Sequence, residues 1–393
     1  MRLITIVFVL ALIGSMAWGE NAAGASPKTL QEGKSLYVCS NQGMKLVKFD
    51  SETGTKQADF LGVDAPVDVD VGPGDFIFAT DEATGAANVR RFDPATGQAD
   101  TDPYGDTSLY LGGPRGLAFG PDGHLYVADM LFGVSQVVEF DDTGAYVQVL
   151  PDDPDNPVLI SIEDVACDGS GSIYVTQWIY EGTEVAGVYK FTGTGWQLLG
   201  GTGDLLAPWG LAFGPDGDLY VVDEDINHFG VFRYNGTTGA VKGLFGQTAA
   251  NLGQPGYLAF GPDGDLYVAD AQDNTVKKFS GPLKPDAGTF KGIFGETAVN
   301  VPEPIGLVFG PSGGVQPQKP TLAIEKLGTG NILVTLTGTS GKSYELRHTP
   351  DATVSDFTTW TFGATITLEG TTTGSWEDTA PADRTRFYKA KEQ

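Results

Sequence analysis

The stretch GLAFGPDGDLYVVD, Gly210–Asp223, places two short apolar runs on either side of a polar Pro-Asp-Gly turn. Near copies stand at Gly116–Asp129 and Tyr257–Asp270. The turn chemistry is that of a tight hairpin, because Pro presets φ and Gly tolerates a positive φ. The pattern therefore predicts a β-hairpin whose strands are apolar on both faces. Such strands must be packed on both faces, as in a sheet stacked between two others.

The first strand of this hairpin recurs six times, at intervals of about 47 residues. The six copies begin at Pro66, Pro114, Ile162, Pro208, Pro255 and Pro304. Each of the first five hairpins is followed by a third run, such as VVEFD, and four of these by a fourth run, such as YVQVL. Short antiparallel strands in units of about 45 residues are typical of propeller blades.

The two ends of the repeat region complement each other. Residues 35–62 read as the second, third and fourth strands of a unit that lacks its first strand, and residues 304–310 read as a first strand without a following hairpin. Joined in one blade, they close the ring and leave no open edge between the first and last blades. We therefore expect an all-β, six-bladed β-propeller over residues 35–311. Seven blades is the alternative if residues 311–330 contain a further unit.

The C-terminal part has a different pattern. Residues 312–320 form a Pro/Gly/Gln-rich linker, and residues 321–393 contain six short runs separated by Gly, Thr, Ser and Asp turns. These predict a small antiparallel β-sandwich. With its YELRHT, Trp-containing and RFYK runs, the segment resembles fibronectin-III-like modules of secreted bacterial proteins. The resemblance implies a spacing module or a contact with a cell-surface or matrix polymer.

The N-terminus predicts export. Arg2, the apolar run Leu3–Ile13 and the small residues Ala17 and Gly19 form a secretory signal peptide over residues 1–19, followed by a linker over residues 20–34. No later stretch is long and apolar enough for a membrane span, so a secreted or periplasmic protein is expected.

Charge and cysteine content bear on the partners and the covalent structure of the protein. The chain has 50 acidic and 24 basic residues, a formal charge of −26. Nucleic-acid binding is therefore not expected, because it needs basic patches. The acidity favours solubility outside the cell, with divalent-cation binding as the alternative. Cys39 and Cys167 fall in different parts of the ring, so two buried, unpaired thiols are expected.

One mouth of the central channel carries the candidate site. It is formed by the residues that enter each first strand and by the loops between second and third strands. Where the repeat copies differ from the small or apolar default, the residues are Arg115, Glu163, Asp164, Asp68, Trp209 and Tyr257. Trp178 and His228 lie on neighbouring loops. An arginine, carboxylates and aromatics around a cavity predict a polar ligand pocket, and a solvated rim with one Arg–Glu pair is the alternative.

The second strands are predicted to end at Ser40, Thr80, Asp129, Gln177, Asp223 and Asp270. The aspartates among them are expected to brace the following loop through backbone N–H groups. Asp223, Glu224 and Asp225 form the densest acidic cluster on this side. It lacks the loop pattern of a strong calcium site.

The repeat PDGDLYVAD, followed by a V-x-x-F run, resembles the NHL-repeat propellers. It is also similar to the wider group of streptogramin B lyases and gluconolactonase/regucalcin-like proteins. The lyases imply a histidine base with a metal, but His228 is the one histidine expected near this mouth, because His124 lies in a turn at the opposite mouth. The gluconolactonase-like group implies a Glu/Asn/Asp metal set. Glu163 and Asp68 suit such a set, and no asparagine occupies the remaining rim positions.

Three functions follow as hypotheses. The first is an extracellular scaffold that binds a protein, peptide, glycan or small ligand at the channel mouth. The alternative is a metal-assisted lyase or lactonase, with calcium or another divalent ion, that uses Glu163, Asp68 or Asp164 and is supported by His228. A purely structural surface-layer component is the third.

Overall fold

The computed structural model describes residues 35–83, 85, 87–131, 134–151, 159–178, 185–199, 205–225 and 229–311, and six further strands between residues 321 and 392 by their backbone. The chain divides into two compact units, one spanning residues 22–313 and the other including residues 314–393. The predicted signal peptide and the linkers over residues 20–34 and 312–320 lie outside the described residues.

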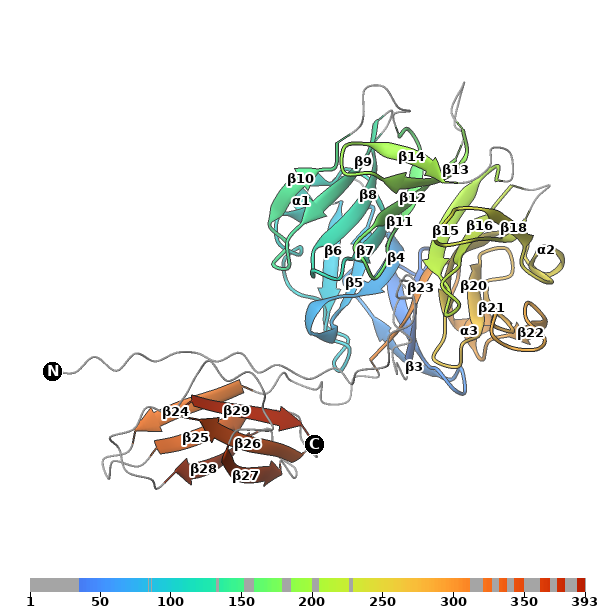
Figure 1. Ribbon diagram of the computed structural model, residues 1–393. Coiled ribbons are helices and arrows are strands. Elements are labelled where there is room, and N and C mark those ends of the chain that lie inside the picture. The colour runs from blue at the N-terminus through green and yellow to red at the C-terminus, as the bar shows by residue number, and fades with distance from the viewer. Residues whose placement is uncertain are drawn as a thin grey trace. The chain divides into compact units, whose positions relative to one another are not determined.

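The first unit is a ring of six antiparallel sheets, as the repeat predicted (Figure 1). Blade 1 contains β4 (Pro66–Val71), β5 (Ile77–Asp81) and β6 (Asn88–Phe92). Blade 2 contains β7 (Pro114–Phe119), β8 (Leu125–Leu131), β9 (Val134–Phe140) and β10 (Tyr146–Val149). Blade 3 contains β11 (Ile162–Cys167), β12 (Ile173–Gln177), β13 (Gly187–Phe191) and β14 (Trp196–Leu199).

The remaining three blades complete the ring. Blade 4 contains β15 (Pro208–Phe213), β16 (Leu219–Asp223), β17 (Gly230–Tyr234) and β18 (Val241–Leu244). Blade 5 contains β19 (Pro255–Phe260), β20 (Leu266–Asp270), β21 (Thr275–Phe279) and β22 (Phe290–Ile293). Blade 6 contains β23 (Pro304–Gly310), β1 (Ser35–Ser40), β2 (Lys45–Asp50) and β3 (Lys56–Phe60).

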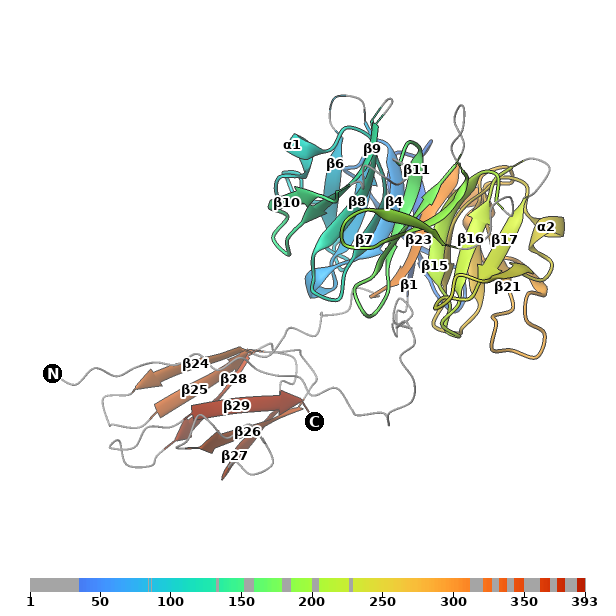
Figure 2. The ribbon, with the colours of Figure 1, turned by 45° about the horizontal axis from the view of Figure 1, so that its top comes forward.

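The ring closes in blade 6, as predicted. Strand β23 pairs antiparallel with β1, with Ser35 opposite Gly310 and Val38 opposite Leu307. In Figure 2 the orange β23 lies beside β1, although the two are at opposite ends of the domain's sequence. Closure removes the unpaired strand edges that an open ring would expose.

Apolar side chains fill the spaces between neighbouring blades. Six clusters of buried hydrophobic residues occupy the six blade interfaces. Aromatic residues of a second strand meet a phenylalanine that ends the next blade's first strand. The ring centroids lie 4.9 Å apart for Tyr220 and Phe260 and 4.7 Å apart for Tyr267 and Phe309, both edge-to-face. This packing explains why the inner strands are apolar on both faces.

A four-residue motif, an aromatic residue followed by Gly, a polar residue and Thr, occurs at three places between neighbouring blades. Its Thr is the first residue of a short helix in each case: α1 (Thr107–Tyr110), α2 (Thr248–Asn251) and α3 (Thr297–Asn300). At α2, Thr248 Oγ1 accepts from the backbone N–H of Val231 and donates to the carbonyl of Phe245. Gly246, at φ +56°, packs directly on Gly288 of the next blade. A side chain does not fit there, because a Cβ on Gly246 would lie 2.3 Å from the Gly288 Cα.

Blade 1 differs from the others at its outer edge. Its fourth strand is reduced to an isolated bridge between Phe92 and Ala99. The segment after β6 reads DPATGQADTDP, which lacks the apolar alternation of a strand. The missing strand is therefore a property of the local sequence.

Neither cysteine forms a disulfide, as predicted, but Cys39 is buried, whereas Cys167 is half-buried. The second unit contains β24 (Thr321–Lys326), β25 (Ile332–Thr337), β26 (Ser343–Thr349), β27 (Thr361–Thr367), β28 (Thr373–Asp378) and β29 (Phe387–Glu392). They form two three-stranded antiparallel sheets. Their packing as a β-sandwich and the fibronectin-III resemblance stay predictions. In the part of the chain that the structure describes, no helix has the length and apolar character to cross a membrane.

Candidate functional site

Each first strand carries a β-bulge where it enters the ring. In blade 2 the pairing with β8 shifts between Pro114 and Leu117, so Arg115 and Gly116 fall in the bulge. The same shift occurs in the other first strands. Bulges release residues from the ladder and redirect their side chains, which is why they gather beside functional sites. The rim positions predicted from the repeat are therefore the bulged positions.

Arg115 lies between two glutamates from the blades on either side of it. Its Nη1 lies 3.2 Å from Oε2 of Glu82, which follows β5 in blade 1. Its Nε lies 3.7 Å from Oε2 of Glu163, in the bulge of β11 in blade 3. The Arg115 side chain is 20% exposed, Glu82 33% and Glu163 2%. Arg115 therefore covers a buried carboxylate while it contacts a more exposed one.

The Arg115–Glu163 contact leaves two polar atoms without hydrogen bonds within the described residues. Arg115 Nε and Glu163 Oε2 are buried, and each forms no hydrogen bond. A separation of 3.7 Å is too long for a direct hydrogen bond. A single O–H group placed beside both atoms would accept from Nε–H and donate to Oε2. Buried atoms of this kind require an explanation, and these two belong to oppositely charged side chains that contact each other.

The electrostatics of the pair follow from its burial. Burial raises the pKa of Glu163 to about 7, although Arg115 and Trp178 act in the opposite direction. Burial also disfavours the charge on Arg115, but Glu163 and Glu82 outweigh it and hold the Arg115 pKa above its ordinary value. A carboxyl that changes protonation near neutral pH is suited to general acid–base catalysis.

A second carboxyl with a raised pKa lies at the same mouth. Glu224 follows β16, and its backbone N–H donates to the carbonyl of Ala207. Burial raises the pKa of Glu224 to about 7, against the lowering effect of Gln254. Its charge also raises the pKa of Glu163. Unlike Glu163, Glu224 is only half-buried, so solvent reaches it.

Asp68 and Asp164 lie deeper, where they join adjacent blades. Oδ2 of Asp68 accepts from the backbone N–H of Leu117 at 3.1 Å, and Oδ2 of Asp164 accepts from that of Leu211 at 2.8 Å. Both residues are 4% exposed. These carboxylates therefore satisfy the backbone of the next blade's first strand, and their assignment to a ligand site stays a prediction.

The residues of this deeper layer alternate around the ring between a large side chain and glycine. In order they are Asp68, Gly116, Asp164, Gly210, Tyr257 and Gly306. A Cβ on Gly210 would lie 2.5 Å from the Cα of Tyr257, so only glycine fits there. The alternation lets three side chains fill the channel below the rim, and this layer forms the floor of the mouth.

Tyr257 and Trp209 form the aromatic side of the mouth. The Tyr257 hydroxyl donates to the backbone carbonyl of Glu163 at 2.9 Å and is buried. The ring centroids of Trp209 and Tyr257 lie 6.5 Å apart in an edge-to-face arrangement. Trp209 itself is half-buried. Of the two, Trp209 is the more exposed, and it packs against two hydrophobic clusters, so its role in ligand binding stays a prediction.

The aspartates predicted at the ends of the second strands are structural, as expected, although β8 continues past Asp129 to Leu131. Asp129 accepts from the N–H groups of Gly112 and Gly113, which precede the first strand of the same blade. Asp223 and Asp270 do the same for their own blades. The braced segment therefore precedes the first strand, whereas the following loop was expected; Asp223 also accepts from the backbone N–H of Asp225 in the following loop. In blade 1 the equivalent residue is Asp81, which pairs with Pro66, so the expectation of Thr80 was wrong by one residue.

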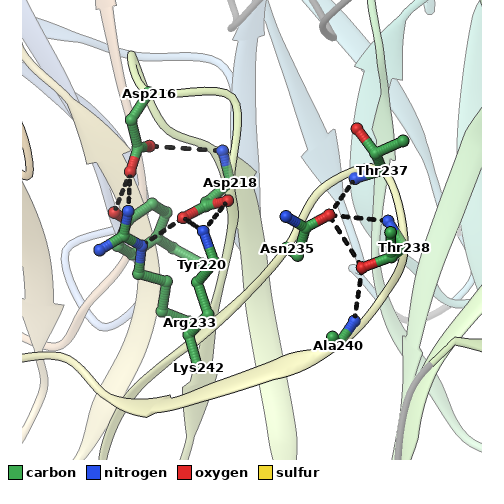
Figure 3. A network of polar contacts seen from close by, with 9 residues as sticks. All are labelled: Asp216, Asp218, Tyr220, Arg233, Asn235, Thr237, Thr238, Ala240 and Lys242. Atoms are coloured by element: carbon green, nitrogen blue, oxygen red, sulfur yellow. Dashed lines mark hydrogen bonds and ion pairs between the residues drawn. The ribbon is translucent and has the colours of Figure 1, made fainter.

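The opposite mouth carries ion pairs at the hairpin turns. His124 lies there, as predicted, with its Nδ1 2.7 Å from Oε1 of Glu139. Figure 3 shows the equivalent turn of blade 4, where Arg233 contacts Asp216 and Asp218 and the Lys242 amine lies 2.6 Å from Asp218. These oppositely charged groups neutralise one another.

Other site residues divide into two groups. His228 lies outside the described residues, and Trp178 is half-buried directly after β12 of blade 3, where it lowers the pKa of Glu163. The repeat pattern did not mark Glu82 as a member of the site and placed Glu224 only in an acidic cluster. Both immediately follow the last residue of a second strand, and that shared position was the available signal.

A metal set of the kind implied by the gluconolactonase resemblance does not fit the described residues of this mouth. The Arg115 guanidinium stands between Glu82 and Glu163, where its positive charge opposes a second cation. Asp68 and Asp164 are held by backbone N–H groups. Among the residues that the structure describes, no three His, Cys, Asp or Glu side chains are grouped to hold a metal ion.

Comparison with known proteins places this arrangement in a family. The family described as the SMP-30/gluconolactonase/LRE-like region matches residues 23–284, more than half of the chain. No curated protein matches the chain.

Several solved structures share the fold. A protein of unknown function from Bacteroides caccae is similar with a TM-score of 0.50 at 14% identity, covering 70% of this chain and 98% of that one. A gluconolactonase from Xanthomonas campestris has a TM-score of 0.48 at 14% identity, covering 82% and 96%. Streptogramin B lyase has a TM-score of 0.48 at 16% identity, covering 72% and 86%. At these identities the likeness concerns the fold alone.

Proposed function

This chain belongs to the SMP-30/gluconolactonase/LRE-like family, and from that premise we propose that it is a hydrolase of small hydroxylated lactones that acts at the Arg115/Glu163 mouth of the propeller. The observation that carries the proposal is the pair of facing polar atoms, Arg115 Nε and Glu163 Oε2, which are buried, 3.7 Å apart and without hydrogen bonds in the described part of the chain. The family supports this enzymatic reading over the binding scaffold expected from the sequence.

In the proposed reaction Glu163 acts as the general base. A water molecule between the two atoms accepts from Arg115 Nε–H and donates to Glu163 Oε2. Glu163 takes that proton as the water oxygen bonds to the lactone carbonyl carbon, and the carbonyl oxygen becomes an oxyanion. Collapse of this intermediate breaks the ring C–O bond, and the leaving oxygen takes the proton back from Glu163. The product is the open-chain hydroxy acid, and Glu163 is regenerated.

The surrounding residues have supporting roles in this proposal. Arg115 orients the water and stabilises negative charge as it develops, the usual role of a preorganised cation in acyl transfer. Trp209 offers an aromatic face to the apolar side of a sugar-like ring. Glu224, which is solvent-accessible and titrates in the same range, is placed to exchange protons with solvent.

The test is lactone hydrolysis followed by acid release. A panel of five- and six-membered aldonolactones is offered to the full chain, to Glu163→Gln and to Glu52→Gln. Glu52 lies in an exposed turn of blade 6 and makes a matched control. We expect E163Q to lower kcat by about 10²–10⁴-fold, the range of a general base, and E52Q to retain activity. The proposal would be rejected if the full chain hydrolysed none of the lactones, or if E163Q kept full activity.

Location is proposed separately, on the residue pattern of the N-terminus alone. We propose that the protein is exported through the segment over residues 1–19. Fractionation of cells expressing the full chain, with mass spectrometry of the N-terminus, tests this. A chain retained in the cytoplasm with residues 1–19 still attached is the contrary result.

A further inference from the structure

We propose that the Arg115 guanidinium is the built-in cation of this mouth, so that no divalent metal is required at Glu82 and Glu163. The inference rests on the proposed function, because it concerns the same residues. It departs from the Glu/Asn/Asp metal set that the gluconolactonase resemblance implies.

The position of Arg115 leaves little room for a metal ion between the two glutamates. Arg115 reaches two carboxylates from the blades on both sides of its own, with Nη1 3.2 Å from Glu82 and Nε 3.7 Å from Glu163. Two carboxylates that converge on one point are the usual protein ligands of a hard divalent cation. Here the point between them is taken by a side chain of the fold itself.

The charge of Arg115 also opposes a metal ion at this point. Arginine remains protonated in proteins, and Glu163 and Glu82 hold the pKa of Arg115 still higher. A divalent cation bound to Glu163 would lie beside this fixed positive charge in a buried environment, where Coulomb repulsion is poorly screened. The guanidinium and a metal therefore exclude each other.

The carboxylates in the floor of the mouth are already engaged in contacts between blades. Asp68 and Asp164 accept hydrogen bonds from Leu117 and Leu211 of the following blades. Moving either carboxylate toward a metal would break the contact that joins two first strands. The described residues of the mouth are therefore organised around a guanidinium.

The experiment measures metal uptake without substrate, so it is independent of catalysis. The full chain is dialysed against chelator, loaded separately with Ca²⁺, Mn²⁺ or Zn²⁺, desalted and analysed for metal per chain. The variants are wild type, Glu163→Gln, Arg115→Ala, Arg115→Lys and the double variant R115A/E163Q. Thermal unfolding confirms that each is folded.

We expect wild type and E163Q to retain equal amounts of each metal. We expect R115A to retain one cation more per chain than R115K, and R115A/E163Q to lose it, because the vacated carboxylates then form a cation site. The proposal would be overturned if wild type retained one metal ion per chain more than E163Q. It would also be overturned by a folded R115A that takes up no more than R115K. If R115A does not fold, the comparison of wild type with E163Q decides alone.

The two proposals fail separately. Absence of lactone turnover rejects the proposed reaction and leaves the metal result unaffected. Turnover that stops on chelation and returns with a metal ion retains the reaction but overturns the role of Arg115. Turnover that chelation leaves unchanged supports both proposals.

Discussion

The Tyr257 hydroxyl donates a hydrogen bond of 2.9 Å to the backbone carbonyl of Glu163, although blade 4 stands between their two blades in the ring. The bond ties the aromatic side of the mouth to the bulge that presents the Glu163 side chain. A contact between blades that are not neighbours is possible because Gly210 of blade 4 contributes no side chain at this level. Tyr257 is therefore a positioning residue for Glu163.

Tyr257→Phe should destabilise the protein and disturb the site. The substitution leaves a buried carbonyl without its donor, which costs about 1–3 kcal/mol. Chemical denaturation measures the loss, and Tyr110→Phe, at an exposed ring, is the control. We expect Y257F also to shift the pH profile of lactone hydrolysis. An unchanged profile together with unchanged stability would show that the bond does not position Glu163.

The pH dependence of activity should report the ionisation of Glu163. Burial raises its pKa to about 7, and a general base works in its deprotonated form. We expect kcat/KM to rise about tenfold per pH unit below pH 7 and to level off above it. A limb with a midpoint near pH 4 would indicate an ordinary exposed carboxyl and contradict the assignment.

The pH dependence of stability should have the opposite direction. The Glu163 pKa is higher in the folded state than in the unfolded chain, so the folded state binds more protons between about pH 4.5 and 7. The free energy of unfolding should therefore fall by up to about 3 kcal/mol as the pH rises through that window. Denaturant titrations of wild type and E163Q at several pH values test this. The free energy of unfolding should fall less steeply with rising pH in E163Q than in wild type. Equal slopes would count against a raised pKa.

Gly210→Ala should be strongly destabilising. Its Cβ would lie 2.5 Å from the Cα of Tyr257, and neither backbone is free to move within the ring. We expect a loss of at least about 3 kcal/mol. Gly217→Ala is the comparison, because a Cβ there meets nothing within 4 Å and only its φ of +77° is unfavourable. A cost in G210A no larger than that in G217A would be inconsistent with the close packing of the floor.

The two thiols should react at different rates. Cys39 is fully buried, and burial raises its pKa well above the ordinary value, whereas Cys167 is half-buried. Because the thiolate is the reactive form, alkylation of the native protein should modify Cys167 first and Cys39 only after unfolding. Mass spectrometry of peptides from the unreduced protein measures both. A Cys39–Cys167 disulfide would contradict the blade assignment.

Some features of the site were readable from the chain because the repeat is strict. Equivalent residues of a repeat occupy equivalent places in the ring. Arg115 and Glu163, which differ from the small or apolar residues at the same repeat position, therefore marked one mouth from the sequence alone. The same regularity predicted the number of blades and the closure of the ring by β1 and β23, which the structure confirms.

Only the tertiary structure shows which carboxylates are hydrogen-bonded to a neighbouring blade and which are not. Asp68 and Asp164 looked equivalent to Glu163 along the chain, but their carboxylates bind the backbone of the next blade, whereas Glu163 Oε2 accepts no hydrogen bond among the described residues. The structure alone placed Glu82 and Glu224 in the site: Glu82 contacts Arg115 of the next blade, and the charge of Glu224 raises the pKa of Glu163. The physical reason is that the contacts of Arg115 with Glu82 and Glu163, and of Tyr257 with Glu163, join different blades whose residues lie far apart in sequence. Local pattern determines the blade, and only the closed ring determines which side chains meet.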